Sequence, residues 1–319
     1  MKRKSISYAK WGYIFLIPFF VVYFIFQLIP ILETFYYSFI DYKVDTGTVS
    51  IFNPDGNVVN NGFCGLQNYI DVLGSDGVFT TSLWNTVVLW IIGFIPQIVV
   101  SLLLAVWFTD IRLKLKAQGF FKTVIYLPNV IMASAISLLF YSLFTQGGAL
   151  YEVFDSLFGL ETSPLNTVAG SRMIVGFINF IMWYGNTTIL LMAAIMGVDT
   201  SLYESAQIDG ANSTQTFWRI TIPLIRPILA YVLVTSMIGG LQMYDVPTLL
   251  GDSSGGPKGV LMTLVMQIQL GRDSSVGTVS AISVLVFIIS AILGFLVLNL
   301  MSDKPPKSKK KKKKIVRAK

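Results

Sequence analysis

The sequence predicts an all-α integral membrane protein with six transmembrane helices and both termini in the cytoplasm. Three observations lead to this prediction. Hydrophobic residues make up 54% of the chain and charged residues 13%, against about 25% charged in soluble globular domains. The apolar residues gather in six long runs that are almost free of charge. The basic residues fall mostly in the segments on one side of those runs.

Each run is long enough to cross a membrane as a helix, since about 20 residues rising about 1.5 Å each span the hydrocarbon layer. Helices are expected because backbone groups in lipid must form hydrogen bonds within their own segment. The domain at 11–301 is flanked by an N-terminal segment, 1–10, and a basic tail, 302–319. The predicted spans are residues 11–32, 83–109, 123–145, 173–198, 227–246 and 276–301.

Basic residues determine the predicted orientation. With the N-terminus inside, 20 of the 24 lysines and arginines lie in inner segments, and basic residues that flank a span stay on the cytoplasmic side. Both termini, and segment 199–226 between the fourth and fifth spans, are therefore expected in the cytoplasm. The first run is longer than the apolar core of a secretory signal, so we expect it to remain as a span.

Several classes of chemistry are disfavoured by composition. The chain has no histidine and one cysteine, Cys64, which removes His-based catalysis, His-ligated metal sites and an internal disulfide. The glycine-rich segment 251–259 departs from a phosphate loop because Pro257 separates Gly256 from Lys258. We therefore expect no metal site, no nucleotide site and no enzyme activity in this chain.

The basic tail contains six consecutive lysines. A nucleic-acid-binding arm is one interpretation. Lysines directly after a span are more favourably placed against anionic lipid, at about 1 kcal/mol each. We therefore expect the lipid bilayer, and not nucleic acid, as the partner of this tail.

Segment 199–226 is polar although two apolar spans flank it. Ser201-Leu-Tyr-Glu204 is a capping box, which predicts a short helix that starts there. Gly210 can adopt the left-handed conformation that ends this helix, and Ser213 or Thr214 can cap a second one. These features alone fit either an interfacial linker or a docking element for another protein.

The same segment resembles the cytoplasmic EAA loop of permease subunits of binding-protein-dependent ABC importers. The family pattern is Glu-Ala-Ala, three residues, Gly, and Ile-x-Leu-Pro about nine residues later. Ser205 and Ile222 depart from it, and the matching residues are Glu204, Ala206, Asp209, Gly210, Ala211, Phe217, Ile220 and Pro223. Four further motifs are similar to the maltose-type, carbohydrate-uptake subgroup: Gly65-Leu-Gln-Asn-Tyr69, Leu83-Trp-Asn-Thr86, Tyr126-Leu-Pro128 and Gly255-Gly-Pro257.

The resemblance implies a type I ABC importer permease fold in a bacterial plasma membrane, and the first permease of a heterodimeric pair. The implied partners are a second permease, two ATPase subunits that bind ATP and Mg²⁺, and an external binding protein, either a lipoprotein or periplasmic. The implied solute is a sugar or oligosaccharide. The implied contacts to the ATPase are Glu204, Ser205, Ala206, Asp209, Gly210 and Ala211.

Polar residues at helical spacing suggest where the solute passes. They recur at i, i+4 and i+7 in the fourth and fifth spans. Amides and hydroxyls can bind sugar hydroxyls, and an aromatic face can cover sugar C–H groups. Packing between helices, or against the partner permease, is the alternative role. The candidates are Asn179, Trp183, Asn186, Thr235, Gly239 and Gln242.

Two other functions stay open at this point. The first is an ABC importer permease for a non-sugar solute such as glycerol phosphate. The second is an ion-coupled secondary transporter, which is expected to place ionisable residues within its spans or to consist of related halves. Neither feature is apparent in the sequence, so the second function is the less favoured.

Overall fold

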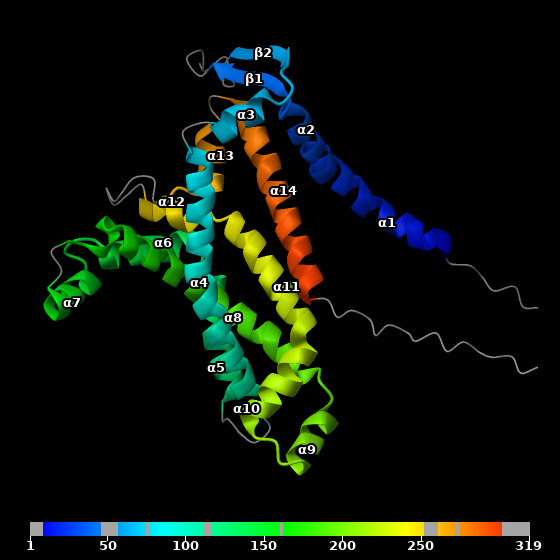
Figure 1. Cartoon of the computed structure of the whole chain (residues 1–319), viewed down its shortest axis with the longest axis vertical. Coiled ribbons are helices and arrows are strands. Elements are labelled where there is room, and N and C mark those ends of the chain that lie inside the picture. Colours follow the sequence, from blue (N-terminus) through cyan, green and yellow to red (C-terminus); the bar gives the residue numbers. More distant parts are fainter. Residues whose placement is uncertain are drawn as a thin grey trace, which may run out of the picture.

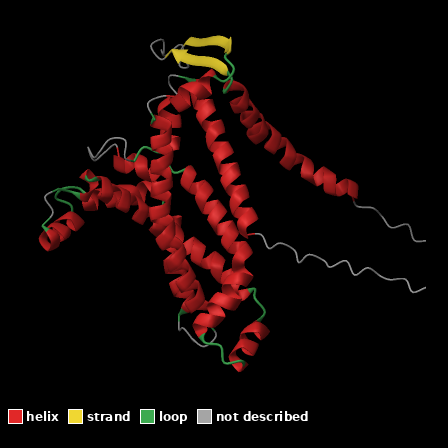
Figure 2. Cartoon of the chain, in the orientation of Figure 1, coloured by secondary structure: helices red, strands yellow, loops and turns green. Residues whose placement is uncertain are grey.

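The computed structural model describes residues 9–45, 57–74, 77–110, 117–159, 162–251, 261–271 and 275–301. This part of the chain is helical apart from one pair of strands (Figure 2). The strands are β1 (Ile40–Asp45) and β2 (Asn57–Phe63). The helices are α1 (Ala9–Tyr23), α2 (Ile29–Tyr37), α3 (Gln67–Gly74), α4 (Val78–Thr109), α5 (Gln118–Val130), α6 (Ala133–Phe144), α7 (Ala149–Phe158), α8 (Val168–Met196), α9 (Thr200–Ile208), α10 (Ser213–Thr216), α11 (Ile222–Leu241), α12 (Asp245–Gly251), α13 (Leu264–Gly271) and α14 (Val276–Met301).

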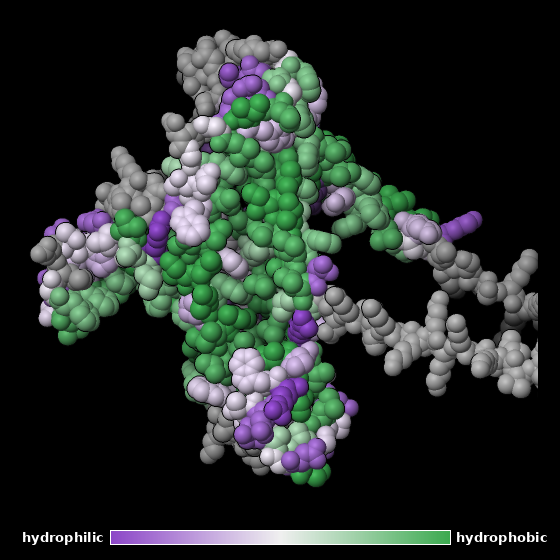
Figure 3. All heavy atoms as spheres, in the orientation of Figure 1, coloured by the Kyte–Doolittle hydropathy of each residue, from purple (hydrophilic) through white to green (hydrophobic). Residues whose placement is uncertain are grey.

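The long helices lie between two polar ends. Strands β1 and β2 and helix α3 form one of them, which we call the hairpin end, and α9 and α10 form the other, which we call the loop end (Figure 1). Hydrophobic residues cover the helical middle, and hydrophilic residues gather at both ends (Figure 3). In the described residues, five helical stretches are long and apolar enough to cross a membrane, or six if one bent pair counts as a single span.

The first and last spans differ in how they meet the bundle. α14 coincides with the predicted sixth span, residues 276–301. The first span was predicted to end at residue 32, but α1, a π-helical segment (Phe24–Leu28) and α2 continue to Tyr37. Pro30 does not end this helix because it lies in the first turn of α2, where a missing N–H is tolerated. α1 projects away from the other helices (Figure 1).

The third predicted span, residues 123–145, is not one straight helix. α5 and α6 meet at 89°, and the residues between them, Ile131 and Met132, have extended backbones with ψ of 138° and 137°. The Asn129 side chain donates a hydrogen bond to the Met182 carbonyl of α8 at 3.0 Å, which holds the break against α8. Hydropathy measures the apolar length of a segment and not its direction, so composition could not predict the bend.

α4 and α8 pack against each other along much of their length. A Cβ on Gly93 of α4 would lie 3.1 Å from the carbonyl oxygen of Gly176 on α8, and such small residues let membrane helices approach closely. The Gln97 Nε2 donates to the Thr187 Oγ1 at 2.8 Å across the same interface. Close backbone contact and a buried hydrogen bond therefore hold this pair together.

Buried polar side chains organise the hairpin end. β1 and β2 are antiparallel, with Ile40 opposite Phe63. Asn68 of α3 is 5% exposed, and its Nδ2 donates to the carbonyls of Ser38 and Ile40, both at 3.0 Å. The Tyr69 hydroxyl donates to the Ser38 Oγ at 2.7 Å. The Asn-Tyr pair of the first subgroup motif therefore fastens α3 to the chain that leaves α2.

The second subgroup motif fastens α4 to the chain before α13. Asn85 and Thr86 are buried. The Thr86 Oγ1 accepts a hydrogen bond from the Leu264 backbone N–H at 3.2 Å, and the Asn85 Nδ2 donates to the Met262 carbonyl at 3.3 Å. The Arg172 Nη2 of α8 donates to the Asn85 Oδ1 at 2.7 Å. These bonds join three parts of the chain that are far apart in sequence.

The fifth predicted span, residues 227–246, is displaced along the chain. α11 runs from Ile222 to Leu241 and follows a π-helical segment (Phe217–Thr221). The chain leaves the helix at Gln242, and α12 begins at Asp245. α12 packs against α6 and α8. The predicted span therefore began five residues late and included the turn that follows α11.

Candidate functional site

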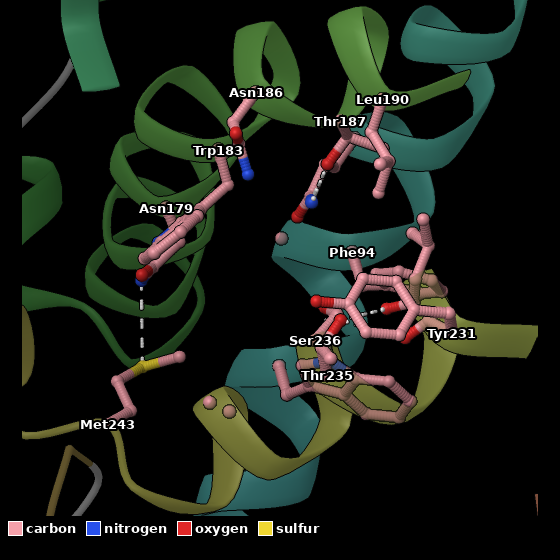
Figure 4. A pocket seen from close by; sticks show the side chains of 16 residues that line it. Phe94, Asn179, Trp183, Asn186, Thr187, Leu190, Tyr231, Thr235, Ser236 and Met243 are labelled. Atoms are coloured by element: carbon pink, nitrogen blue, oxygen red, sulfur yellow. Dashed lines mark hydrogen bonds between the residues drawn. The ribbon is translucent and has the colours of Figure 1, made fainter. Parts of the chain in front are cut away.

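A cavity of about 450 Å³ lies between α4, α8 and α11. This volume is in the range of small-molecule sites, about 300–1,000 Å³. In Figure 4, the α8 side chains lie on one side of the cavity and the α11 side chains on another. The lining residues are Trp90, Gly93, Phe94, Gln97, Asn179, Trp183, Asn186, Thr187, Leu190, Tyr231, Val232, Thr235, Ser236, Gly239, Gly240 and Met243.

The cavity brings together five of the six residues proposed for the solute path. Asn179, Trp183 and Asn186 come from α8, whereas Thr235 and Gly239 come from α11. A Cβ on Gly239 would meet no atom within 4 Å, so this glycine leaves room in the cavity. The sixth residue, Gln242, does not line the cavity, because α11 ends at Leu241 and the helical spacing no longer applies beyond it.

The contribution of α4 was not predicted. Trp90, Gly93, Phe94 and Gln97 line the cavity from one face of α4, because they follow one another at i, i+3, i+4 and i+7. The sequence did contain a feature that could have indicated this face of α4. Gln97 is a polar residue inside an uncharged span, and it lies one turn after Gly93 and Phe94. On α11, Gly240 packs closely on Trp90, since a Cβ there would lie 2.6 Å from the Trp90 Cγ.

Some polar groups of the cavity bind each other and others remain available. The Trp90 Nε1 donates to the Ser236 Oγ at 3.1 Å, which joins α4 to α11. The Asn179 Nδ2 donates to the Met243 Sδ at 3.5 Å (Figure 4). Among the described residues, no hydrogen bond involves the Asn186 side chain, and Trp183 is 47% exposed. Asn186 and Trp183 can therefore contact a solute.

The cavity contains no acidic or basic side chain among its lining residues. Its polar groups are amides, hydroxyls and an indole N–H, which bind neutral polar molecules by hydrogen bonds. Within the described part of the chain, no three His, Cys, Asp or Glu residues come together as a metal site. The arrangement is suited to binding a polar molecule through hydrogen bonds.

At the loop end, α9 and α10 are joined by a tight turn. The Asp199 side chain caps α9 by accepting a hydrogen bond from the Ser201 backbone N–H at 3.0 Å. The predicted cap at Ser201 is therefore wrong by two residues, although a helix does start at Thr200. Hydrogen bonds from the Ser201 backbone and side chain lower the pKa of Asp199, so the cap is lost only as the pH falls through that lowered pKa.

The turn after α9 has the hydrogen bonds of a Schellman motif. Gly210 has φ of +74°. The Ala211 N–H donates to the Ala206 carbonyl at 2.9 Å, and the Gly210 N–H donates to the Gln207 carbonyl at 3.1 Å. Gly210 therefore ends α9 as the sequence predicted.

A capping box starts α10, but not at the predicted residues. The Gln215 backbone N–H donates to Asn212 Oδ1 at 2.8 Å, and the Asn212 N–H donates to Gln215 Oε1 at 3.0 Å. The predicted caps at Ser213 and Thr214 are therefore wrong. With both helices capped, the geometry of the loop is determined on each side of Gly210.

The proposed coupling residues differ in accessibility. Glu204, Ser205, Asp209 and Gly210 are exposed, and Ala211 is half-buried. Ala206 is 7% exposed, so it packs within this chain and presents little surface to another protein. The exposed residues run along α9 to the turn at the loop end.

Tyr203 connects α9 to the base of α11. Its hydroxyl lies 3.3 Å from the Thr221 Oγ1, which is in the π-helical segment before α11. A second cavity of about 380 Å³ separates much of the loop from the ends of α4 and α8. The loop therefore lies against the bundle through few contacts, one of which leads to the helix that carries Thr235.

The sequence matches the profile of the family described as the binding-protein-dependent transport system inner membrane component, over residues 97–304. The chain belongs to this family. The match includes the second part of α4 from Gln97, all of α8, the α9–α10 loop, α11 and α14. The protein is therefore a membrane permease subunit of ABC importers, which is a transport subunit.

Relatives of this permease align over nearly its whole length. The lactose transport system permease protein LacF of Rhizobium radiobacter is 28% identical and covers 89% of this chain and 92% of its own. The arabinooligosaccharides transport system permease protein AraP of Bacillus subtilis is 30% identical and covers 89% of this chain and 88% of its own. A chain of a solved bacterial ABC transporter for import of the acidic polysaccharide alginate has a TM-score of 0.73 at 20% identity. The match covers 92% of this chain and 96% of that chain. The protein therefore has the type I importer permease fold.

One residue of the permease loop was missed in the sequence. Ile208 is 87% exposed at the last position of α9, directly before Asp209 and Gly210. A single exposed apolar side chain is ordinary on a protein surface, and Ile208 is of interest because it lies between Glu204 and Asp209 of the same loop. Its position next to the Asp-Gly pair was the available signal.

Proposed function

We propose that this chain is one of two permease subunits of an ATP-driven importer for a sugar or oligosaccharide. An external binding protein delivers the solute, and two ATPase subunits dock at the loop end, which faces the cytoplasm. The observation that carries the solute class is the cavity of amides, hydroxyls and aromatic rings between α4, α8 and α11. The relatives LacF and AraP are named for the transport of lactose and of arabinooligosaccharides, and these names support the same class of solute.

The residues that line the cavity are typical of a sugar-binding site and not of an ion-coupled transporter. Sugar hydroxyls need partners that donate and accept hydrogen bonds, and sugar C–H groups stack on indole rings. Asn186 and Trp183 offer these contacts from adjacent turns of α8. An ion-coupled transporter needs an ionisable group in the membrane, and the lining has neither an acid nor a base.

The loop end supports coupling to an ATPase. Glu204 and Asp209 are exposed charges, and Ile208 is an exposed apolar side chain between them. We propose that the ATPases bind ATP and Mg²⁺, and that closure of their dimer moves α9. The contact between Tyr203 and Thr221 would then pass this motion to α11 and to the cavity.

Replacing Trp183 is the direct test of the solute site. In proteoliposomes that contain the complete importer and its binding protein, Trp183→Ala is expected to lower sugar uptake five- to tenfold, because it removes about 1–1.5 kcal/mol of aromatic contact. Trp84→Ala is the matched control, since Trp84 is 63% exposed on α4 and does not line the cavity. Equal uptake by both variants would show that the cavity does not bind the solute.

The ATPase interface predicts a second result. Ile208→Asp is expected to weaken binding of the ATPase subunits at least about tenfold, because burial of an isoleucine side chain contributes about 1.5–3 kcal/mol. The measurement is the dissociation constant between the permease pair and the ATPase in detergent. Ile208→Leu keeps the apolar surface and should bind normally. Normal binding by Ile208→Asp would place the interface elsewhere.

A further inference from the structure

We infer that the α4–α8–α11 cavity accepts uncharged saccharides and excludes acidic sugars and solutes that carry phosphate. The inference rests on the proposed function and adds the charge class of the solute. By this inference, the solute of this chain differs in charge from that of the importer of the acidic polysaccharide alginate. The likeness to that importer, at 20% identity, shows the fold alone. It also decides between sugar and glycerol phosphate, which the sequence left open.

The first argument is that no lysine or arginine lines the cavity, and that the single arginine of α8 and the single arginine of α11 lie outside its lining. α4 has no charged side chain, and α8 and α11 contain one arginine each. Arg172 is seven residues before Asn179, and its Nη2 binds the Asn85 Oδ1 at 2.7 Å. The Arg226 Nη2 binds the Leu300 carbonyl at 2.7 Å, near the loop end of α11. Burial of an anion without a cation is strongly unfavourable.

The second argument is that the charged side chain nearest to the lining in sequence is an acid. Asp245 is exposed, and it lies two residues after Met243, which lines the cavity. A carboxylate at this position repels a solute of the same charge and has little effect on a neutral one. Its charge therefore adds to the exclusion of anions.

The third argument is that the available polar groups fit hydroxyls better than ionised oxygens. Asn179 uses its Nδ2 in hydrogen bonds, which leaves its Oδ1 as an acceptor, and the Thr235 hydroxyl donates to the Tyr231 carbonyl, which leaves its oxygen as an acceptor. Asn186 provides both a donor and an acceptor. A sugar hydroxyl can donate to these acceptors, whereas an ionised carboxylate has no proton to donate and leaves them without a partner.

The test measures binding to the complete importer in lipid nanodiscs, without the external binding protein, so that selection by that protein does not contribute. Tryptophan fluorescence is titrated with neutral probes (lactose, maltotriose and arabinotriose) and anionic probes (trigalacturonate and glycerol 3-phosphate). Trp183→Phe shows how much of the signal comes from Trp183, since Trp90 also lines the cavity. The tightest neutral probe is expected to bind at least about tenfold more tightly than any anionic probe. Equal or tighter binding of an anionic probe would overturn the inference.

A cation placed in the cavity should reverse the preference. Asn186→Lys is expected to tighten binding of trigalacturonate at least about tenfold and to weaken the best neutral probe, whereas Asn186→Gln adds no charge and should not tighten binding of trigalacturonate. No change in either probe with Asn186→Lys would also overturn the inference. If no saccharide is bound or imported while an amino acid or an ion is, the proposed function itself fails. If both charge classes of saccharide bind alike, only the charge inference fails.

Discussion

Gly210→Val is expected to leave the permease assembled in the membrane while lowering uptake at least about tenfold. Gly210 has φ of +74°, and a β-branched residue is a strained outlier in this region, at about 1–2 kcal/mol or more. A penalty of about 1.4 kcal/mol already lowers the equilibrium constant between the native loop conformation and its alternatives tenfold. A Cβ on Gly210 would meet no atom within 4 Å, so the effect comes from backbone geometry and not from packing.

The substitution at Gly210 acts on the turn between α9 and α10. When residue 210 leaves the left-handed region, the hydrogen bond from the Ala211 N–H to the Ala206 carbonyl breaks. The direction of α9 is then no longer fixed, so the contact between the Tyr203 hydroxyl and Thr221 is lost and a push on α9 no longer reaches α11. Uptake and ATP hydrolysis in proteoliposomes separate these effects, because uncoupling lowers sugar uptake more than it lowers ATP hydrolysis.

Gly210→Asn is the matched control. Asparagine tolerates the left-handed conformation far better than valine, so this variant should keep most of the uptake. Co-purification of both permeases with the ATPase confirms that each variant assembles. Wild-type uptake by Gly210→Val would mean that the shape of the loop plays no part in coupling.

Sequence reasoning succeeded where one local signal determines the structure. Uncharged length placed a helix at α14, because a membrane helix needs apolar residues on every lipid-facing side. Gly210 was identified as the end of α9 because few other residues adopt a positive φ. Asn179, Trp183 and Asn186 were predicted to share one helical face because of their spacing, and all three line the cavity.

The failures arose where a distant contact decides the structure. The break between α5 and α6 is held by Asn129 against the Met182 carbonyl, 53 residues away, and no local pattern reports this. β1 and β2 pair across residues 46–56, and this strand pair was not predicted from the sequence. Gln242 was assigned to the cavity on a helical spacing that α11 does not continue.

The roles of two motifs of the sugar-importer subgroup also depend on contacts between distant parts of the chain. In the sequence, Asn68 and Asn85 were noted only as members of two subgroup motifs. Both are buried, and each binds backbone carbonyls of another segment. A buried amide can join two segments because it donates and accepts hydrogen bonds at once, but its partners become visible only in the folded chain.

Gly185→Ala is expected to prevent stable folding of the permease. A Cβ on Gly185 of α8 would overlap the Ile125 carbonyl oxygen of α5, and would lie 2.8 Å from the Ile125 carbonyl carbon and 3.1 Å from the Tyr126 Cα. All three are backbone atoms, so no side-chain rotation can relieve the overlap, and α5 must move away from α8. Overpacking of this kind costs about 1–3 kcal/mol, and more where the backbone itself has to shift.

Separation of α5 from α8 also affects the site, because the hydrogen bond from Asn129 to the Met182 carbonyl depends on the same contact. The measurement is the yield of intact permease pair in detergent and its thermal stability. Gly119→Ala is the matched control, since Gly119 lies on α5 itself and a Cβ there would meet no atom within 4 Å. Wild-type yield and stability for Gly185→Ala would mean that α5 and α8 do not approach this closely, and the bend after α5 would then need a different support.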